Sequence, residues 1–330
     1  MTVTPEGRAP VFIAVYSVML ALSTAFVWAR VYTRAFVVKN LGADDYCAFI
    51  SWILFVFFYS FATAGAHHGT GQHLSNILPA TEFPIAMKWW WACEPVYVLC
   101  SMALKLSIAF MLLRLTIVRT HRCIIYAVTA VTQAYSVFYF FLFVFQCRPS
   151  SYFWTQYTGG EGSCLPGDVV VSATYGYSAI LCLGDWIFAI LPVFMVWDLQ
   201  MNRSTKISVA SILAMGAIAS TATVIRFPYV ASLADTTDFL YATVDLAIWS
   251  IVETGLGLIA CSAATLRPLA RTLFANTSFL GSSGARCGTT NHWPSTGGAE
   301  GYIRSGADDS YGMRSDLGKK RGVTTTVQAG

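Results

Sequence analysis

Seven long runs of apolar residues, separated by short polar stretches, dominate the chain up to residue 264. The runs cover 11–29, 46–66, 87–113, 123–145, 169–196, 207–230 and 240–264. An apolar helix of about 20 residues is long enough to cross the hydrocarbon core of a bilayer. Soluble helices of this length would carry a polar face, and most of these runs do not. The pattern therefore predicts an all-α polytopic membrane protein, with a seven-transmembrane-helix bundle over residues 11–273.

Composition supports this class of fold. Hydrophobic residues make up 55% of the chain and charged residues only 12%, whereas a soluble domain carries about 25% charged residues. We therefore expect a multi-pass protein in contact with the lipid bilayer, either of the plasma membrane or of an endomembrane. The net charge of +4 is modest and follows from the basic loops described next, so we expect no nucleic-acid partner.

Basic residues alternate between the loops and predict an orientation. One set of connections carries most of them: Arg30, Arg34, Lys39, Arg114, Arg119, Arg122, Arg203, Lys206, Arg267 and Arg271. The other set carries only Arg8, Lys88 and Arg148. Basic loops stay on the cytoplasmic side. The short N-terminus, 1–10, is therefore predicted to be external and the C-terminus cytoplasmic, with the first run acting as an uncleaved signal anchor.

The last part of the chain, 274–330, differs in composition from the rest. It is rich in glycine, serine, threonine and charged residues and has few aliphatic side chains. Such a segment cannot bury enough apolar surface to offset the entropy lost on folding. The sequence predicts a disordered cytoplasmic tail.

The nine cysteines divide according to the predicted topology. Cys147 and Cys164 share the external loop between the fourth and fifth runs, on an oxidising side of the membrane. We predict a disulfide between them, which would contribute about 3 kcal/mol in the chain-entropy account. Cys93, near the outer end of the third run, is a rival partner for Cys164. Most other cysteines lie in or beside the apolar runs, where we expect them to act as small packing residues.

Ionisable residues inside the apolar runs are the candidate site. Charges near the bilayer centre cost about 2.5–3.5 kcal/mol on insertion scales and are usually paired and functional. Lys105 can pair with Asp185 or with Glu253, and Arg226 can form a second pair with Asp245. Two interpretations stay open: a network that fixes helix packing, or a binding cavity or proton path. The expected polar network comprises Glu94, Lys105, Asp185, Arg226, Asp245 and Glu253.

Other candidate chemistry is weaker. His67, His68 and His73 cluster in one external loop and have the softness that zinc or copper accepts, but their spacing favours a capping or interfacial role, and we predict no metal. No nucleophile elbow, phosphate loop or metalloprotease motif occurs, so no catalytic residue is assigned. The last run contains no lysine, and retinal needs a lysine amine there to form a Schiff base. We therefore expect no retinal and no other cofactor.

Short polar motifs mark the ends and middles of the runs in a specific order. They are Asp44-Asp45-Tyr46, Gly69-Thr70-Gly71-Gln72-His73, Lys105-Leu106-Ser107, Arg114-Leu115, Gln146-Cys147-Arg148-Pro149 with Trp154 and Cys164, Asp185 with Pro192, Lys206, Arg226, and Trp249-Ser250 with Glu253. In these motifs the chain resembles the fungal rhodopsin-domain family of integral membrane proteins. That family includes Pth11-like receptors and members encoded in mycotoxin gene clusters such as that for satratoxin. The resemblance covers roughly Arg30 to Leu273.

The resemblance implies a role in secondary metabolism or signalling and no known reaction. The function expected first is an integral membrane accessory protein of a fungal secondary-metabolite pathway that binds or moves a small apolar product, with pathway enzymes as partners. A Pth11-like seven-helix receptor acting on a cytoplasmic signalling protein is the alternative. The cysteine-rich external domain of some such receptors is not expected here, because only about ten residues precede the first run. A membrane-embedded enzyme of the same pathway is the second alternative.

Overall fold

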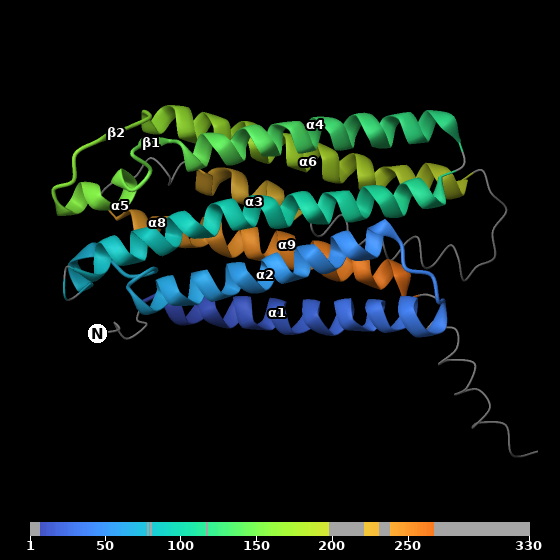
Figure 1. The fold of residues 1–330 in the computed structure, drawn as a ribbon, viewed down its shortest axis with the longest axis horizontal. Helices are drawn as coiled ribbons and strands as arrows, with labels where there is room; N and C mark the ends of the chain where they lie inside the picture. The colour runs from blue at the N-terminus through green and yellow to red at the C-terminus, as the bar shows by residue number, and fades with distance from the viewer. Residues whose placement is uncertain are drawn as a thin grey trace, which may run out of the picture. The chain divides into compact units, whose positions relative to one another are not determined.

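The computed structural model describes residues 7–77, 79, 81–116, 118–197, 221–230 and 238–266. All of them belong to the first of two compact units, Met1–Gly281. Long helices run side by side through this unit, and the chain reverses direction between successive long helices over residues 9–197 (Figure 1). The main elements are α1 (Ala9–Tyr32), α2 (Ala43–His67), α3 (Glu82–Leu115), α4 (Arg119–Val144), α6 (Gly167–Trp197) and α9 (Val244–Thr265). Residues 221–230 are also helical.

Smaller elements lie in the connections. A π-helical turn, Thr33–Val37, extends α1, and two single-turn helices, α5 (Tyr152–Thr155) and α8 (Phe239–Ala242), lie near the end of the bundle where α1 begins. Strands β1 (Cys147–Arg148) and β2 (Ser163–Cys164) pair antiparallel, with Cys147 opposite Cys164. Short 3₁₀ turns occupy Leu74–Asn76 and Gln156–Thr158.

Six helical segments of the described chain are long and apolar enough to cross a membrane. They are Ala9–Val37, Ala43–His67, Glu82–Leu115, Arg119–Val144, Gly167–Pro192 and Phe239–Thr265. Six of the seven predicted spans are therefore present as helices. Of the remaining span, 207–230, only residues 221–230 are described, and these are helical. The rest of that span and the predicted tail lie outside the described residues, so the count of seven, the tail and the sidedness of the termini stay predictions.

The helices are longer than the apolar runs because polar residues form their first turns. Helix α2 begins three residues before the predicted run and includes Asp44 and Asp45. The carboxylate of Asp45 accepts a hydrogen bond from the backbone N–H of Gly42 at 3.0 Å, which satisfies a donor that the helix itself leaves open. Acidic side chains are also favoured at this positive end of the helix dipole. Hydropathy therefore places the membrane-buried part of each helix but not its capping turn.

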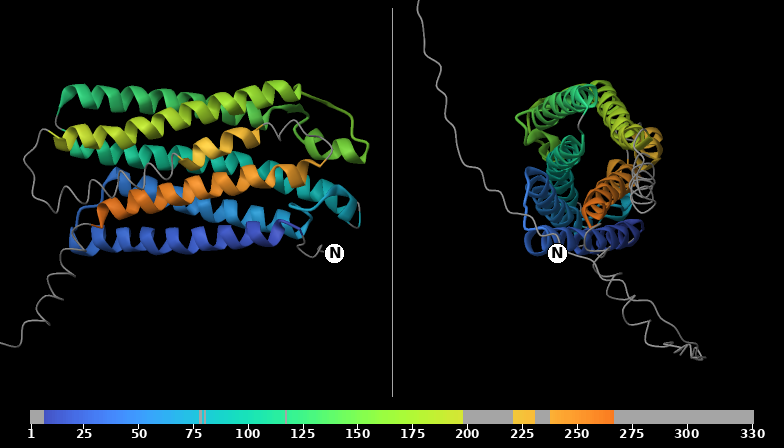
Figure 2. Two further views of the ribbon diagram at one scale, coloured as in Figure 1. Left: turned by 180° about the vertical axis from the view of Figure 1, so that it is seen from behind. Right: turned by 90° about the vertical axis from the view of Figure 1, so that its right-hand side faces the viewer.

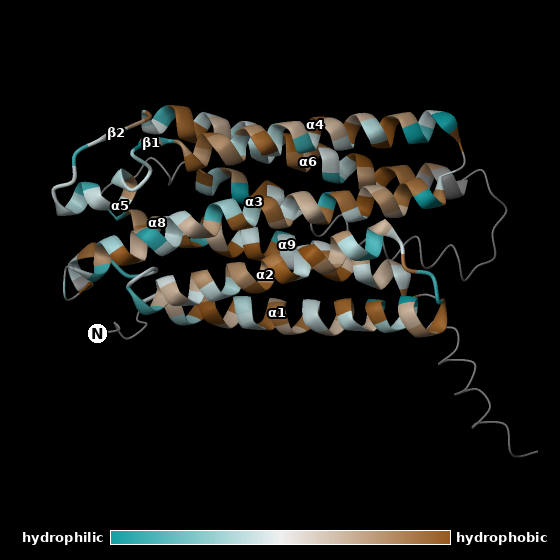
Figure 3. Ribbon diagram, in the orientation of Figure 1, coloured by the Kyte–Doolittle hydropathy of each residue, from teal (hydrophilic) through white to brown (hydrophobic). Residues whose placement is uncertain are grey.

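The interior of the bundle is aromatic, and its outer surface is apolar. Helix α2 packs along α3, α1 along α9, and α4 along both α3 and α6; seen end-on, the helices surround a common axis (Figure 2). Four tyrosines of the described chain are fully buried, namely Tyr16, Tyr97, Tyr139 and Tyr177. Large apolar side chains point outward: Leu183 is 65% and Phe194 61% exposed. An apolar exterior along the helices, with hydrophilic residues gathered toward the ends of the bundle (Figure 3), is the surface that lipid tails require.

A glycine turn after α2 joins three elements at one end of the bundle. Gly69 and Gly71 have φ angles of 116° and 94°, a region that residues with a Cβ rarely adopt. The N–H of Gly71 donates to the carbonyl of Leu240 on α8, and its carbonyl accepts from the N–H of Arg8 before α1, each at 3.2 Å. This explains the two glycines of the Gly69–His73 motif in terms of backbone geometry.

Candidate functional site

Lys105 of α3 and Asp185 of α6 form an ion pair inside the bundle. Both side chains are largely buried, with 5% of Lys105 and 14% of Asp185 exposed. The sequence left two acids open as partners of Lys105, and the structure selects Asp185. Asp185 can reach the lysine because α3 and α6 are in contact with each other.

Arg226 and Glu253 form a second buried pair, between segment 221–230 and α9. The distance from Arg226 Nη1 to Glu253 Oε2 is 3.7 Å, and the two side chains are 1% and 7% exposed. The guanidinium also donates to the hydroxyl of Tyr97, and its central carbon lies 4.9 Å from the centre of the Tyr97 ring. The phenol of Tyr97 thus gives the cation both a hydrogen-bond acceptor and a π face.

The predicted pairing of Arg226 with Asp245 is wrong. Asp245 pairs with Arg8, which immediately precedes α1, and both side chains are partly exposed. Asp245 lies eight residues before Glu253 on α9, which is about 12 Å along a helix axis. Arg226 is level with Glu253, so Asp245 is out of its reach. Asp245 therefore belongs to the surface of the bundle and not to its interior network.

Glu94 lies on the same face of α3 as Lys105 but has different neighbours. Its Oε1 accepts a hydrogen bond from the hydroxyl of Tyr139 at 3.1 Å. Tyr139 is held in place by the hydroxyl of Thr174, also at 3.1 Å, and by stacking on Tyr177 with ring centres 4.5 Å apart. No ion pair to Glu94 occurs among the described residues, although the field of Arg226 reaches it.

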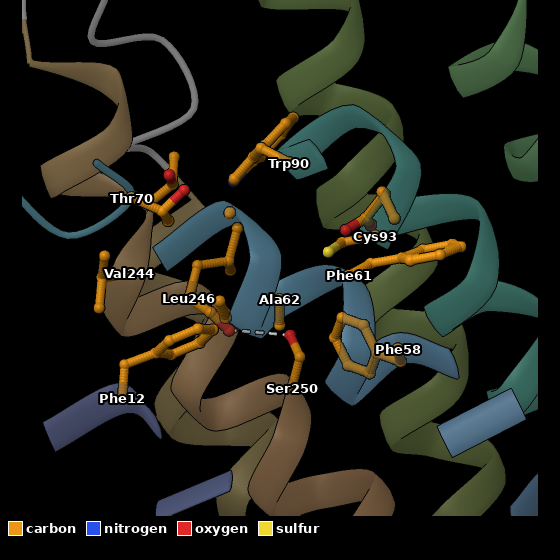
Figure 4. A pocket seen from close by; sticks show the side chains of 14 residues that line it. Phe12, Phe58, Phe61, Ala62, Thr70, Trp90, Cys93, Val244, Leu246 and Ser250 are labelled. Atoms are coloured by element: carbon orange, nitrogen blue, oxygen red, sulfur yellow. Dashed lines mark hydrogen bonds between the residues drawn. The ribbon is translucent and has the colours of Figure 1, made fainter. Parts of the chain in front are cut away.

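Four of these ionisable side chains, Glu94, Lys105, Asp185 and Glu253, line two cavities. The first, which we call the Lys105 cavity, has a volume of about 80 Å³ and lies between α3, α6 and α9. Lys105, Asp185 and Glu253 line it together with Ser101, Thr254, Cys261 and apolar side chains. The second, the Glu94 cavity, has a volume of about 40 Å³ and lies between α1, α2, α3 and α9. Figure 4 shows the rings of Phe12, Phe58 and Phe61 around it, with Trp90 and Cys93.

A third cluster of charges lies at the end of the bundle where α1 ends. Arg30 donates from Nε to Asp45 and from Nη2 to Asp44, each at 2.8 Å. Its Nη1 donates to the carbonyl of Cys261 at 2.9 Å, and only 1% of Arg30 is exposed. Arg30 thus fastens α1 to the start of α2 and to α9. We call this arrangement the Arg30 clamp.

The sequence placed Arg30 in a loop, and this assignment was wrong. Helix α1 continues to Tyr32, which brings Arg30 inside the bundle. The side chains that were missed fall into two groups: Arg30 and Arg8, interpreted only as topology signals, and Tyr97 and Tyr139, which lie inside apolar runs and were not singled out. A signal existed for Tyr97, because it follows Glu94 by three residues and therefore shares its face of the helix. No comparable signal pointed to Tyr139.

Cys147 and Cys164 form a disulfide that joins β1 to β2. Cys93 is a free thiol and lines the Glu94 cavity, so the rival pairing is not present in the structure. Cys123, expected to pack in the core, is exposed at the start of α4. Cys123 is the fifth residue of α4 and precedes Ile125, the first buried residue of that helix, so it lies before the packed part of the helix.

The three histidines are spread over different partners. His67 is the last residue of α2. His68 Nδ1 lies 2.6 Å from Glu82 Oε2, and His73 Nδ1 lies 3.2 Å from Asp238 Oδ2. His73 also stacks on Tyr241 with ring centres 3.8 Å apart. In the part of the chain that is described, no group of three metal-ligating side chains is gathered.

Comparison with known proteins identifies the family. Residues 29–272 match the family model of the fungal rhodopsin domain. A SAT4 family membrane protein of Emericella nidulans is 28% identical over 167 residues, which are 48% of this chain and 41% of that protein. Satratoxin biosynthesis SC1 cluster protein 4 of Stachybotrys chartarum is 23% identical over 175 residues, 53% of this chain and 62% of that protein.

The matched segments thus cover less than two thirds of either relative, and no solved structure matches the chain. The family model, in contrast, extends from the end of α1 to beyond α9. It includes the Arg30 clamp, the Lys105 cavity and all residues that line the Glu94 cavity except Phe12. Together with the six apolar helices, this match identifies a multi-pass membrane protein that belongs to the fungal rhodopsin domain family.

Proposed function

We propose that this chain is an accessory membrane protein of a fungal secondary-metabolite pathway that binds a small, largely apolar product or intermediate in the Lys105 cavity. One observation carries the proposal. The ion pair Lys105–Asp185 and a further carboxylate, Glu253, line the same cavity, and the other walls of this cavity are mostly apolar. Ligand sites typically have such walls, with a few polar groups that fix the orientation of the ligand.

The chemistry of the cavity indicates the class of ligand. Apolar walls favour a hydrocarbon or terpenoid skeleton, because burying such a skeleton removes apolar surface from water. Lys105 offers N–H donors and Asp185 and Glu253 offer acceptors, so a hydroxyl or carbonyl group on the skeleton would find a partner. The cavity of about 80 Å³ holds part of such a molecule, and binding of the whole would require α3, α6 and α9 to separate slightly.

The relatives support the biological setting. One of them carries the name of a satratoxin biosynthesis cluster protein. A membrane protein in such a pathway has an evident task, since apolar products dissolve in the bilayer and must be taken up or released there. Pathway enzymes at the membrane surface are the partners this role implies.

The test is a comparison of metabolites from the parent strain and a deletion strain. We expect the deletion to lose or redistribute a small apolar metabolite between cells and medium, and the wild-type gene to restore it. The double variant Lys105→Met/Asp185→Asn should fail to restore the metabolite, although it leaves no unpaired charge. Lys88→Met provides the matched control, because Lys88 lies exposed on the same helix, and it should restore the metabolite fully. Unchanged metabolite profiles in the deletion strain would contradict the proposal.

One observation favours a receptor as the second candidate. Cys261 lines the Lys105 cavity, and its backbone carbonyl is also held by Arg30 of the clamp. A ligand that moves Cys261 would therefore also disturb the clamp, and with it the connection between α1 and α2. A receptor predicts ligand-dependent coupling to a cytoplasmic signalling protein, which is lost when Arg30 is replaced. If the protein is instead an enzyme, the purified protein should form product, and the variants Asp185→Asn and Glu253→Gln should not.

A further inference from the structure

Within the apolar runs, the interior side chains include one more carboxylate than cations. Within the seven apolar runs, the interior charges are Glu94, Asp185 and Glu253 on the acidic side and Lys105 and Arg226 on the basic side. Asp245 and Lys88 do not enter this balance, since the first pairs with Arg8 and the second is exposed. Residues 207–220, outside the described part, contain no charged side chain. The excess of one negative charge is therefore a property of the whole set of spans.

The structure shows which carboxylate carries the excess. Lys105 is paired with Asp185 and Arg226 with Glu253. Glu94 has the hydroxyl of Tyr139 as its hydrogen-bond donor and no cation in contact among the described residues. A carboxylate in an apolar interior is costly unless a positive charge or a proton compensates it. Among the described residues, Glu94 is therefore the interior carboxylate of the apolar runs that has no cation in contact.

The surroundings of Glu94 fit a particular kind of cation. Glu94 lines the Glu94 cavity, whose other walls include Phe12, Phe58, Phe61 and Trp90 (Figure 4). Aromatic faces attract cations through the ring quadrupole, most strongly when water is excluded. Ammonium groups that carry methyl substituents suit such walls better than metal ions do, because their surface is apolar while their charge remains.

The cavity is small and has further polar side chains in its wall. Its volume is about 40 Å³, and by this measure a single water needs about 10–15 Å³. The space thus holds a few waters. A trimethylammonium group is similar in bulk to benzene, which fills a cavity of about 150 Å³, so its entry requires the helices around the cavity to separate slightly. Thr70, which is 7% exposed, also lines the cavity, and its hydroxyl has no hydrogen-bond partner among the described residues. It can accept or donate a bond to a polar tail of the ligand.

We propose that the Glu94 cavity is a second binding site, distinct from the Lys105 cavity, for an alkylated ammonium ion, with Glu94 as the counterion and Phe58, Phe61 and Trp90 as the aromatic walls. The site lies toward the end of the bundle where α1 and α9 begin, since Phe12, Thr243 and Val244 also line it. It is independent of the proposed pathway role, because none of its lining residues contributes to the Lys105 cavity.

The experiment uses the full chain in lipid nanodiscs with choline as the probe. Its uncharged carbon isostere, in which a tert-butyl group replaces the trimethylammonium group, serves as the control ligand. Choline should raise the midpoint of thermal unfolding in a saturable manner, because it binds the folded state. The isostere should give at least about tenfold weaker binding, since it lacks the charge that Glu94 compensates.

Matched variants separate the site from general effects. Glu94→Gln keeps the size of the side chain and an acceptor for Tyr139, and it removes an unpaired charge, so it should fold and lose the choline response. Glu161→Gln makes the same change at an exposed position in the loop between β1 and β2 and should keep the response. Phe61→Leu should weaken the response without removing a charge.

Several outcomes would overturn the site. Equal stabilisation by choline and by its isostere would show a purely apolar pocket, and an unaltered response in Glu94→Gln would remove Glu94 from it. No stabilisation of the wild type by choline would mean that a proton, and not a cation, compensates Glu94. If Glu94→Gln fails to fold, direct measurement of choline binding to the wild type and to Phe61→Leu decides. These measurements do not involve any pathway metabolite. A result that contradicts the choline site therefore leaves the proposed pathway role untouched, and the reverse also holds.

Discussion

At the scale of single residues, the ammonium of Lys105 is stable inside the bundle because Asp185 compensates its charge. In soluble proteins, removing one partner of a buried ion pair costs about 3–5 kcal/mol, whereas replacing both by neutral groups costs little. The acid left behind can recover part of this cost by taking up a proton. Losing one member of the pair should therefore lower the stability of the protein more than replacing both members by neutral side chains.

Lys105→Met is accordingly expected to lower the abundance and the thermal stability of the protein, and Lys105→Met/Asp185→Asn to recover both. Fluorescence-detected size-exclusion chromatography after stepwise heating measures the effect. Lys88→Met is the control with the same change at an exposed site on α3. Normal stability of the single variant would show that the pair does not hold the helices together.

The Arg30 clamp allows a stricter test of geometry. Arg30 donates through three different nitrogens to Asp45, Asp44 and Cys261. A lysine has the charge but lacks the planar fork that makes such contacts simultaneously. Arg30→Lys should therefore destabilise the protein, and Arg30→Met should do so more strongly, because two buried carboxylates then lose their main cation. Equal stability of the wild type and Arg30→Lys in the same heating assay would mean that charge alone matters there.

The sequence identified most of the residues of the candidate site but not their pairing. Charged residues within apolar runs are conspicuous because insertion penalises them, so Glu94, Lys105, Asp185, Arg226 and Glu253 could be named in advance. Which charges meet depends on the depth and rotation of each helix, and these are set by packing. That is why Arg226 was assigned to Asp245 and not to Glu253, and why the role of Tyr139 was not foreseen.

At the scale of elements, the two short strands and their disulfide order the connection between α4 and α6. The bond links Cys147 to Cys164 across the β1–β2 pair, and the segment between them includes α5. Phe153 and Trp154 of α5 pack against Trp90 and Trp91 of α3, with ring centres 5.9 and 5.4 Å apart. The loop thus covers the end of α3 that leads into the Glu94 cavity.

Loss of this disulfide should loosen the loop more than the bundle. Cys164→Ser is expected to cost about 3 kcal/mol by the chain-entropy account and to increase proteolysis within the loop. Cys93→Ser, a change at a free thiol, should have little effect on proteolysis. Mass spectrometry of peptides from the unreduced protein checks the pairing directly. A peptide that joins Cys93 to Cys164 would contradict the structure and favour a staple between α3 and the loop.

The helices themselves were the most predictable elements. A bilayer requires every backbone polar group to be satisfied within the segment, so a long apolar run leaves few alternatives to a helix. The ends were less predictable, because the first turns of α2 and α3 contain acids, Asp44 and Glu82 among them, which hydropathy assigns to loops. The strands β1 and β2 have no hydropathy signal, since each comprises only two residues.

At the scale of the whole molecule, the direction of the chain through the membrane follows from charge. The alternation of helix directions (Figure 1) brings Arg34 and Arg114 to the same end of the bundle, where both lie near Asp44. Arg119 and Arg122 begin α4 at that end. This end is predicted to be cytoplasmic because positive loops are retained there. Arg30 is buried and paired with two acids, so it does not contribute to the positive charge of the loops. The cytoplasmic assignment of this end therefore rests on its other basic residues.

The prediction is that a reporter fused after Arg271 is cytoplasmic and one placed before Val11 is external. A third reporter, inserted after Glu161 in the loop between β1 and β2, should share the side of the N-terminal fusion, because α1 begins and α4 ends at the same end of the bundle. Glycosylation of engineered acceptor sites or accessibility of the reporters in intact cells measures the sides. If the N-terminal and C-terminal reporters lie on the same side of the membrane while the loop reporter is external, the number of spans must be even. The seven-helix arrangement, in which residues 207–230 form the sixth span, would then be wrong.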